Sequence, residues 1–381
     1  MKKALIVTTV GGFVPKFEMN NVYLLQSLGY EVHYASNFEY LVYQDSTNTL
    51  KNTKIICHSI KFVRSPFQLN QNIKAYCQLY QLLKKEKFFL VHCHTPMGGF
   101  LTRIATWRYH IKNKEKIQVI YTAHGFHFYR GAPLFNWLFF YPIERFLALL
   151  TDRLITINLE DYHRAKSFRL KKGGKLCYVP GVGVDIKELQ KRVSKTEKQK
   201  ALRQKFSHLL FYAGELNKGK NVKTLIKALA KMKQSDCALL ICGEGPEQKR
   251  LKQLASKYGV TKRVIFAGYR LDVPELMKCC DIFLFASKRE GRSVAVMEAM
   301  ACSLPAIVSK IRGNSELIVQ GKGGFLIRPD DAEGFAKAAD YLLSRKKQCK
   351  KMGQFNANRV KEFGIEKISE QMQKIYQEVT K

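Results

Sequence analysis

Residues 282–301 read IFLFASKREGRSVAVMEAMA. The apolar run Ile282–Ala286 predicts a strand that is buried on both faces, as strands of parallel sheets are. Glu290 then lies in the loop at the carboxyl end of this strand, where Gly291 permits a turn into a helix that begins near Ser293. On 3.6-residue geometry, Glu298 lies about one and a half turns into that helix. A strand, a loop and a helix in this order form the repeating unit of an α/β fold.

The same unit recurs along the chain, because short apolar runs are each followed by a helical pattern. A polar stretch at 187–200 separates two such series and reads as the connection plus a solvated helix start. With 381 residues, the chain is also longer than one core usually organises. We therefore predict two Rossmann-like domains at 1–187 and 188–360, each with a doubly wound parallel sheet, and an amphipathic C-terminal helix at 361–381 that packs back towards the first domain. The predicted strands are Ala4–Val10, Glu31–Ala35, Lys54–Ile60, Leu90–Cys93, Ile117–Thr122, Arg153–Asn158, Leu209–Ala213, Ala238–Ile241, Arg263–Ala267, Ile282–Ala286 and Ala306–Ser309.

The chain is strongly basic, with 65 Lys and Arg against 31 Asp and Glu and a formal net charge of +34. A charge of this size implies an anionic partner, such as nucleic acid, anionic lipid or phosphorylated metabolites. Both halves share the excess, so no basic tail carries it. Because no recognisable nucleic-acid reader motif accompanies the charge, we expect no nucleic-acid partner.

The cysteines and the apolar runs indicate a cytoplasmic protein. The ten cysteines form no CxxC pair and several lie in apolar strand-like runs, which predicts reduced and mostly buried thiols. The first residues show no secretory cleavage pattern. The longest apolar stretch, 134–150, is interrupted by Asn136, Pro142 and Glu144, so it is not expected to span a bilayer.

Two glycine pairs follow predicted strands. Gly11-Gly12 ends the first strand, and Gly243-Glu244-Gly245-Pro246 ends the strand at 238–241. Without a Cβ, a glycine lets a ligand phosphate approach backbone N–H groups at a helix start. Tight strand-to-helix turns require the same residue, so both interpretations stay open.

The segment around Glu290 and Glu298 is more specific. Between the two carboxylates begins a helix, whose free N–H groups and positive dipole end suit a diphosphate. The carboxylates can accept hydrogen bonds from hydroxyl groups, although a helix carboxylate such as Glu298 is commonly just paired to a surface lysine. A diphosphate site between two hydroxyl-binding carboxylates is what a nucleotide-sugar donor needs.

At this point the sequence resembles a known family. The E-x7-E spacing of Glu290 and Glu298 is similar to the donor-site signature of the retaining glycosyltransferases of family 4, which have the GT-B fold of two Rossmann-like domains facing a central cleft. Segments beginning at Ala213 (AGELNKGKN) and Cys242 (CGEGP) continue the resemblance. Thr122-Ala-His124-Gly-Phe-His-Phe-Tyr-Arg-Gly-Ala-Pro resembles a subgroup that assembles bacterial exopolysaccharide and capsule.

The resemblance implies a donor, an acceptor and a set of site residues. A hexose or N-acetylhexosamine would pass from a nucleotide sugar, a UDP-sugar, to a saccharide linked to undecaprenyl diphosphate, with no cofactor and no obligatory metal. Catalytic roles would fall to Glu290, His124 and Lys220. Substrate contacts would come from Gly11, Gly12, Lys218, Gly243, Glu244, Arg292, Ser293, Val294 and Glu298.

The chain departs from the family pattern at Glu215, where many members carry an arginine that embraces the diphosphate with the lysine. A carboxylate cannot replace that guanidinium. We expect Lys218, Lys220 or Arg292 to supply the positive charge.

Two other enzyme classes stay open. His92, His94, His124 and His127 close two neighbouring strands and could converge on a metal, as in a metal-dependent hydrolase, although no acidic ligand pattern accompanies them. A nucleotide-sugar epimerase with the GT-B fold would use the same donor signature without an acceptor.

The aromatic and basic run 130–153 also allows two interpretations. It reads as a core helix with snorkelling ends. Alternatively, an exposed aromatic face beside arginines would rest on an anionic membrane surface and hold the protein on the inner face of the cell membrane.

Overall fold

A computed structural model describes residues 1–39, 50–191 and 203–380. The chain forms two compact units. Unit 1 comprises Met1–Val182 and Glu366–Lys381, and unit 2 comprises Gly183–Ile365. The predicted boundary at 187 lies slightly later, because Val184 already pairs with Gly364 of unit 2. Part of the polar connection, 192–200, lies outside the described residues, whereas Ile186–Lys191 forms helix α6.

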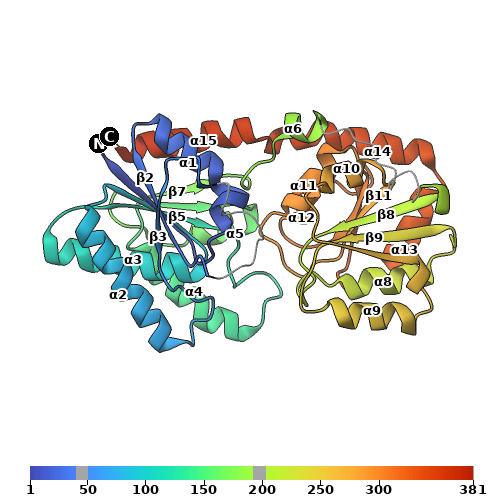
Figure 1. Ribbon diagram of the computed structural model, residues 1–381, viewed down its shortest axis with the longest axis horizontal. Helices are drawn as coiled ribbons and strands as arrows, with labels where there is room; N and C mark the ends of the chain where they lie inside the picture. The colour runs from blue at the N-terminus through green and yellow to red at the C-terminus, as the bar shows by residue number, and fades with distance from the viewer. Residues whose placement is uncertain (40–49, 192–202, 381) are drawn as a thin grey trace. The chain divides into compact units, whose positions relative to one another are not determined.

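Unit 1 contains a parallel sheet of seven strands in the order β3-β2-β1-β4-β5-β6-β7 (Figure 1). The order reverses once, between β1 and β4. The strands are β1 (Lys3–Val7), β2 (Glu31–Ser36), β3 (Ile56–Ser59), β4 (Leu90–His94), β5 (Gln118–Ala123), β6 (Arg153–Thr156) and β7 (Lys175–Tyr178). The helical segments are a π-helix (Val14–Glu18), α1 (Met19–Ser27), α2 (Leu69–Glu86), α3 (Pro96–Asn113), α4 (Leu134–Ala148), α5 (Leu159–Ala165) and α15 (Ile365–Thr380).

Unit 2 repeats this plan with six parallel strands in the order β10-β9-β8-β11-β12-β13, and its order reverses between β8 and β11. The strands are β8 (His208–Ala213), β9 (Cys237–Cys242), β10 (Val264–Gly268), β11 (Ile282–Phe285), β12 (Ala306–Ser309) and β13 (Gly324–Ile327). Besides α6, the helices are α8 (Val222–Lys231), α9 (Gln248–Lys257), α10 (Val273–Lys278), α11 (Val294–Ala301), α12 (Asn314–Leu317), α13 (Ala332–Leu343) and α14 (Lys346–Arg359). Short 3-10 turns occupy Thr261–Arg263 and Val360–Phe363.

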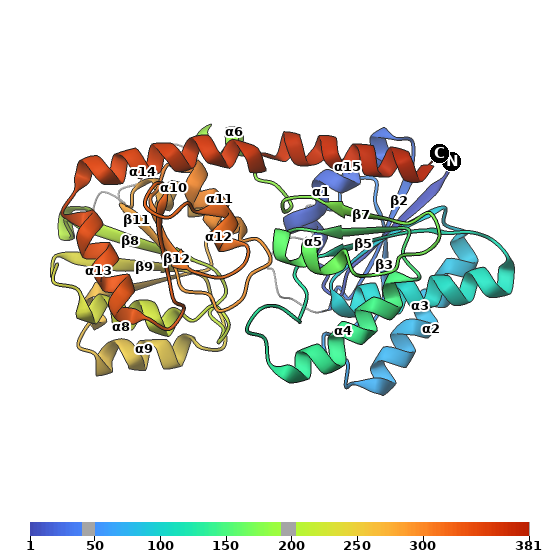
Figure 2. The same ribbon diagram turned by 180° about the vertical axis from the view of Figure 1, so that it is seen from behind.

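Each central strand is buried on both faces, which explains the uninterrupted apolar runs. In β1, Leu5 and Val7 join the apolar cluster on one face of the sheet, whereas Ala4 and Ile6 join the cluster on the other. The second cluster includes Ile368, Met372 and Tyr376 of α15. The last helix of the chain therefore completes the core of unit 1, and Figures 1 and 2 both show it beside the strands of that unit.

Two strands, β7 and β13, were not predicted from the sequence. Both lie at the edge of their sheet and have only one strand neighbour. Their segments, KLCY and GFLI, are largely half-buried, and Lys175 is exposed. An edge strand needs no long apolar run, so the sequence carried too weak a signal.

The cysteines fit the expected reduced state, because all ten are free. Burial is less complete than predicted. Cys57 lies in the edge strand β3 and is exposed, as is Cys77 on α2.

Helix α4 has features of both interpretations of the aromatic run. Leu147 and Ala148 are buried, and Trp137, Phe140 and Tyr141 pack against the core of unit 1. Leu134 and Leu138 are each 78% exposed. The helix therefore packs one face on the core and exposes apolar side chains on the other. Across the described helices, none has the length and apolar character needed to cross a membrane.

Candidate active site

In both units, chemically active side chains lie at or near the carboxyl ends of the strands at which the strand order reverses. Ligands of open parallel sheets bind at this point, outside the carboxyl ends of the strands. In unit 2 the loops after β8 and β11 supply Lys220 and Glu290. In unit 1, Glu18 follows β1, His94 is the last residue of β4, and His124 follows the neighbouring strand β5. Each unit thus has its own candidate half-site.

The half-site of unit 2 is built on an ion pair. Lys220 Nζ lies 2.7 Å from Glu290 Oε1, and the two side chains are 27% and 12% exposed. Glu290 Oε1 also accepts a hydrogen bond from Ser287 Oγ at 2.6 Å. Two of the predicted catalytic residues are therefore in direct contact, although they are 70 positions apart in the sequence.

Asparagines and backbone groups hold the two loops together. Asn217 Oδ1 accepts from the N–H of Lys220 at 3.0 Å, and Asn221 Nδ2 donates to Ala286 O at 3.1 Å. The N–H of Lys288 donates to Gly219 O at 2.8 Å. Because both loops are fixed by these bonds, the Lys220–Glu290 pair lies on a rigid support.

Helix α11 begins where it was predicted to begin. Ser293 is its N-cap, and its side chain accepts from the N–H of Val296. Glu298 lies on the same partly exposed face of the helix as Val294 and Ala295. The start of α11 and Glu298 thus follow the ion pair on one short segment.

Arg292 does not fit the role expected of it. Its side chain is fully buried, and its guanidinium forms an ion pair with Glu316 and lies 4.9 Å from the ring centroid of Phe363. A guanidinium held in this way supports the loop from within and is not available to bind a phosphate. Lys220 and the exposed Lys218 remain as the expected cations.

The glycines of the nucleotide loop are needed for backbone packing. Gly243 has a φ of 134°, and a Cβ there would lie 2.0 Å from Gly214 O. Its exposed neighbour Glu244 accepts from the N–H of Tyr269 at 3.2 Å. In unit 1, a Cβ on Gly11 would meet the ring of Phe38 at 2.7 Å. Close packing therefore explains why glycine is required at Gly243 and Gly11.

A cavity of about 450 Å³ lies at the carboxyl ends of the strands of unit 2. Lys218 is the predicted site residue that lines this cavity. Glu215 is exposed on the same loop, and its backbone O accepts a hydrogen bond from Tyr212 Oη. The lining residues are Asn217, Lys218, Gly219, Asn221, Val222, Lys223, Glu247, Arg250, Leu251 and Lys288.

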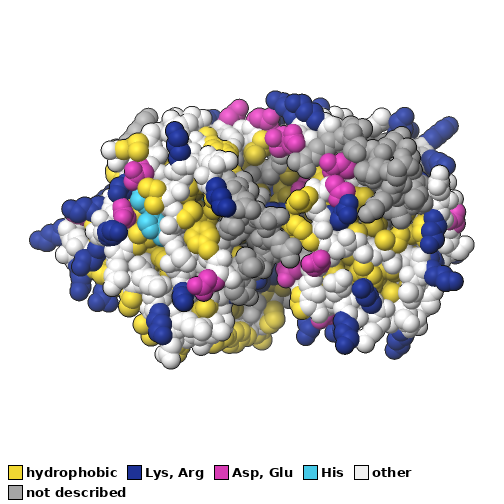
Figure 3. Space-filling view, in the orientation of Figure 1, with side chains coloured by type: hydrophobic (Ala, Val, Ile, Leu, Met, Phe, Trp, Pro, Cys, Tyr) yellow, Lys and Arg dark blue, Asp and Glu magenta, His cyan; other side chains and the backbone are white. Residues whose placement is uncertain are grey.

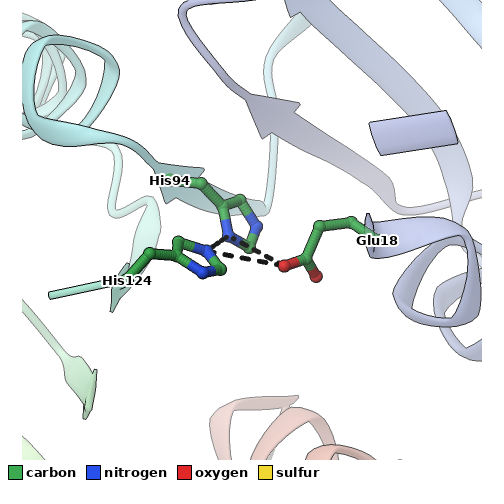
Figure 4. A group of neighbouring side chains, drawn as sticks. All are labelled: Glu18, His94 and His124. Carbon is green, nitrogen blue, oxygen red and sulfur yellow. Dashed lines mark hydrogen bonds and ion pairs between the residues drawn. The ribbon is translucent and has the colours of Figure 1, made fainter. Parts of the chain in front are cut away.

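The half-site of unit 1 is a compact triad, shown in Figure 4. His94 Nδ1 lies 3.0 Å from His124 Nε2, and Glu18 Oε1 lies 3.5 Å from each of these two nitrogens. His94 and Glu18 are buried, whereas the His124 side chain is 21% exposed. The triad therefore reaches the surface of unit 1 through His124.

Burial controls the electrostatics of this triad. Loss of hydration raises the pKa of Glu18 to about 8, a shift that the hydrogen bond from Asn21 only partly offsets. Loss of hydration also lowers the pKa of His94 and of His124. At neutral pH the triad is therefore a neutral cluster of hydrogen-bonding groups.

The cluster of four histidines, an alternative that the sequence had left open, does not form. His92 bonds instead to Tyr376 Oη and Thr122 Oγ1, each at 2.8 Å. His127 stacks on Phe140 at 4.6 Å. The expectation that no acidic residue accompanies the histidines was also wrong, because Glu18 contacts two of them.

The chain around the triad shows local strain. Glu18 ends a π-helix, an element that is often found at functional sites. Thr95, directly after His94, has a φ of 63° and a ψ of 151°, which costs a β-branched residue about 1–3 kcal/mol. Its hydroxyl is held at 2.6 Å from Thr9 Oγ1. Such strain persists where the surroundings fix it, as they do here.

Comparison with known families assigns both halves of the chain. Residues 193–359 match the model of "Glycosyl transferases group 1", and residues 6–158 match "Glycosyl transferase 4-like". The putative glycosyltransferase EpsD of Bacillus subtilis is 37% identical over 98% of this chain and 96% of its own length. The chain is a glycosyltransferase of this family.

Two further relatives of this glycosyltransferase have more specific names. The UDP-Gal:alpha-D-GlcNAc-diphosphoundecaprenol alpha-1,3-galactosyltransferase of Escherichia coli is 30% identical over 74% of this chain and 72% of its own length. The capsular polysaccharide biosynthesis glycosyltransferase CapM of Staphylococcus aureus is 22% identical over 98% of this chain and 97% of its own. These relationships place the glycosyltransferase in the exopolysaccharide and capsule type.

The fold agrees with this assignment. The crystal structure of Anabaena HepE with UDP and glucose superimposes with a TM-score of 0.79 at 19% identity, and covers 99% of this chain and 100% of the other. The glycosyltransferase therefore has the GT-B fold that its sequence predicted.

Proposed function

We propose that the protein is a retaining glycosyltransferase that transfers a sugar from a UDP-sugar to a lipid-linked saccharide. The observation that carries this proposal is the Lys220–Glu290 ion pair at the point where the sheet of unit 2 reverses its strand order. Lys220 would contact the donor diphosphate, and Glu290 would accept hydrogen bonds from sugar hydroxyls. Glu298 would accept from the ribose.

The chemistry follows from where charge develops. As the glycosidic bond breaks, negative charge grows on the leaving phosphate. The ammonium of Lys220 and the N–H groups at the start of α11 are already oriented, so they stabilise that charge without reorganisation. The acceptor hydroxyl then attacks the anomeric carbon from the face that the phosphate leaves and gives its proton to the departing phosphate oxygen, which preserves the anomeric configuration. His124, the exposed member of its triad, would bind the transferred sugar.

The names of related proteins support the substrate classes. The Escherichia coli relative is named for transfer from UDP-Gal to a sugar on diphosphoundecaprenol. HepE was crystallised with UDP and glucose. We extend a UDP-sugar donor and an undecaprenyl-diphosphate-linked acceptor to this protein on those grounds.

We propose further that turnover requires no metal ion, because Lys220 supplies a positive charge of its own. Initial rates should be unchanged after the protein is treated with EDTA. A loss of activity that Mg²⁺ restores would contradict this part of the proposal.

The test of the donor is thermal unfolding with a panel of UDP-, GDP-, ADP- and CMP-sugars. A ligand that binds only the folded protein raises the free energy of unfolding by about 2.7 kcal/mol at 100 times Kd, and so raises the melting temperature. We expect stabilisation by a UDP-sugar, and less of it in Lys220→Ala. NMR of the product should show the anomeric configuration of the donor. Inverted product, or donor conversion without an acceptor, would contradict the proposal.

We propose also that an exposed apolar face of unit 1 rests on an anionic membrane, where a lipid-linked acceptor is found. Helix α4 exposes Leu134, Phe135 and Leu138, and Phe67 stacks near Phe139 at 6.0 Å. Figure 3 shows hydrophobic side chains along the lower edge of this unit, where α4 lies in Figure 1. The exposed Arg145 on the same helix favours an anionic surface.

Vesicle co-sedimentation tests this face. We expect binding to vesicles with anionic lipid, weaker binding to zwitterionic vesicles, and loss of binding in Leu134→Glu/Leu138→Glu. The matched control is Leu271→Glu, which changes a leucine of unit 2 that is 71% exposed. Equal binding by all three proteins would rule this face out.

A further inference from the structure

The triad of unit 1 places three metal-ligand atoms in one spot. Glu18, His94 and His124 each offer one such atom, and these atoms all lie within 4.8 Å of one another. We propose that this triad binds a divalent transition-metal ion, with Zn²⁺ as the best match, and that the bound ion blocks transfer.

The distances fit such an ion closely. The three ligand atoms form a triangle with sides of 3.0, 3.5 and 3.5 Å. In a tetrahedral zinc site with bonds of about 2.0–2.1 Å, ligand atoms lie about 3.3 Å apart. An ion among these three atoms therefore reaches all of them without a shift of the backbone. It replaces the hydrogen bond between the two imidazoles.

The chemistry of the ligands points the same way. Two imidazoles and one carboxylate form a ligand set that zinc sites use, with a fourth position left open. The partly exposed His124 provides that opening and a path of entry. His94 Nε2 has no hydrogen-bond partner among the described residues, so whatever binds Nδ1 decides the tautomer of this ring.

Glu18 adds an argument from charge. It is a buried carboxyl group, and among the described residues the basic side chains within 4 Å of it are only the two histidines of the triad. Asn21 is its neutral hydrogen-bond donor. A buried carboxylate that meets no lysine or arginine is costly when ionised, and a divalent cation offsets that cost.

A second group of similar composition shows that composition alone is insufficient. His33 contacts His58 through Nδ1 and Glu31 through Nε2, each at 2.8 Å. These two nitrogens point in opposite directions, so the three residues do not share a ligand position. His33 and His58 therefore provide an internal control.

The inhibitory effect follows from His124. A metal bound to its Nε2 removes this nitrogen from hydrogen bonding with a sugar. This part of the inference rests on the proposed function, whereas metal binding itself does not.

The experiment uses the full-length protein, treated with EDTA and desalted, and titrated with Zn²⁺ or Co²⁺ alone. We expect one ion per chain by calorimetry and a visible Co²⁺ absorption typical of a four-coordinate site. Glu18→Gln and His124→Ala should each weaken Zn²⁺ binding at least tenfold, whereas His58→Gln should leave it unchanged. Circular dichroism checks that each variant is folded.

Two outcomes would overturn the inference. One is the absence of stoichiometric binding to the wild type. The other is binding that persists in Glu18→Gln and His124→Ala but disappears in His58→Gln. In transfer assays, Zn²⁺ should lower the rate of the wild type. The rate of His124→Ala with Zn²⁺ should equal the rate of the same variant without Zn²⁺. If no transfer is detected at all, the calorimetric result still stands, so a failure of the proposed function is separate from a failure of the metal site.

Discussion

The two units place different chemistry at the same point of the same architecture. In unit 2, where the strand order reverses between β8 and β11, the key contact is a partly exposed ion pair of Lys220 and Glu290. In unit 1, where it reverses between β1 and β4, the nearby contacts join Glu18, His94 and His124, which burial keeps neutral. The fold determines the position of the candidate site in each unit, and the loops determine which side chains lie there.

This difference suggests a division of labour. A partly exposed ammonium group suits the charged diphosphate of the donor, whereas neutral imidazoles suit the hydroxyls of a sugar. Substitutions in each half-site should therefore have unequal effects, and their ranking tests the division.

The largest effect is expected for Lys220→Ala. Loss of a preorganised cation at the developing charge should lower kcat about 10²–10³-fold. Initial rates with saturating UDP-sugar measure it. Lys231→Ala, an exposed lysine at the other end of α8, is the matched control and should behave like the wild type. If both variants keep full activity, Lys220 does not stabilise the negative charge on the leaving phosphate.

Glu290→Gln should be the next most harmful change. A hydrogen bond to a charged acceptor is worth about 1.5–3 kcal/mol, so transfer should fall about 10- to 100-fold. If both residues act on one donor, the Lys220→Ala/Glu290→Gln double variant should lose less activity than the product of the two single losses, because they are in contact. Strictly multiplicative losses would indicate independent roles.

His124→Ala should lower turnover about tenfold, since one neutral hydrogen bond to the sugar is lost. His127→Ala, which changes the histidine three residues later that stacks on Phe140, should leave turnover unchanged. Comparing kcat of the two variants separates the triad from its aromatic neighbour. Similar losses in both would argue that the loop as a whole, not His124, matters.

Tyr376→Phe should have the smallest effect on activity and a local effect on stability. It removes the hydroxyl that bonds to His92 beneath the triad and leaves a buried nitrogen without its partner, which costs about 1–3 kcal/mol. Hydrogen exchange in β4 and α15 should accelerate, while transfer stays near normal. Tyr341→Phe, on the surface of unit 2, should change neither.

Most of the fold could be predicted from the sequence, because strands buried on both faces require continuous apolar runs. Eleven predicted runs correspond to strands of the two sheets, including the buried strands β1, β8 and β11. Two of the eleven, β3 and β10, are edge strands that are largely exposed or only partly buried. The edge strands β7 and β13 were missed because their apolar segments are short and only partly buried. The C-terminal helix could also be predicted, because the apolar residues Ile368, Met372 and Tyr376 recur at helical spacing. All three are buried in the structure.

Only some of the candidate site residues could be placed from the sequence. Lys220 and Glu290 follow predicted strands, so the sequence could place both at the edge of one sheet. Arg292 was misjudged because its partner, Glu316, lies in helix α12, and nothing in the sequence around Arg292 reveals the pair. Glu18 was missed because it ends a π-helix, whose period gives no amphipathic pattern. A carboxylate shortly after a glycine turn at the end of β1 was the one available signal.

The discontinuity of unit 1 has a consequence for biosynthesis. A ribosome makes α15 after every strand of both sheets, yet Tyr376 belongs to the same apolar layer as Ile6 near the start of the chain. During translation, that layer stays uncovered until unit 2 has already emerged. Unit 2, which is continuous in sequence, is free to fold first, and unit 1 reaches its final form only when the last helix docks.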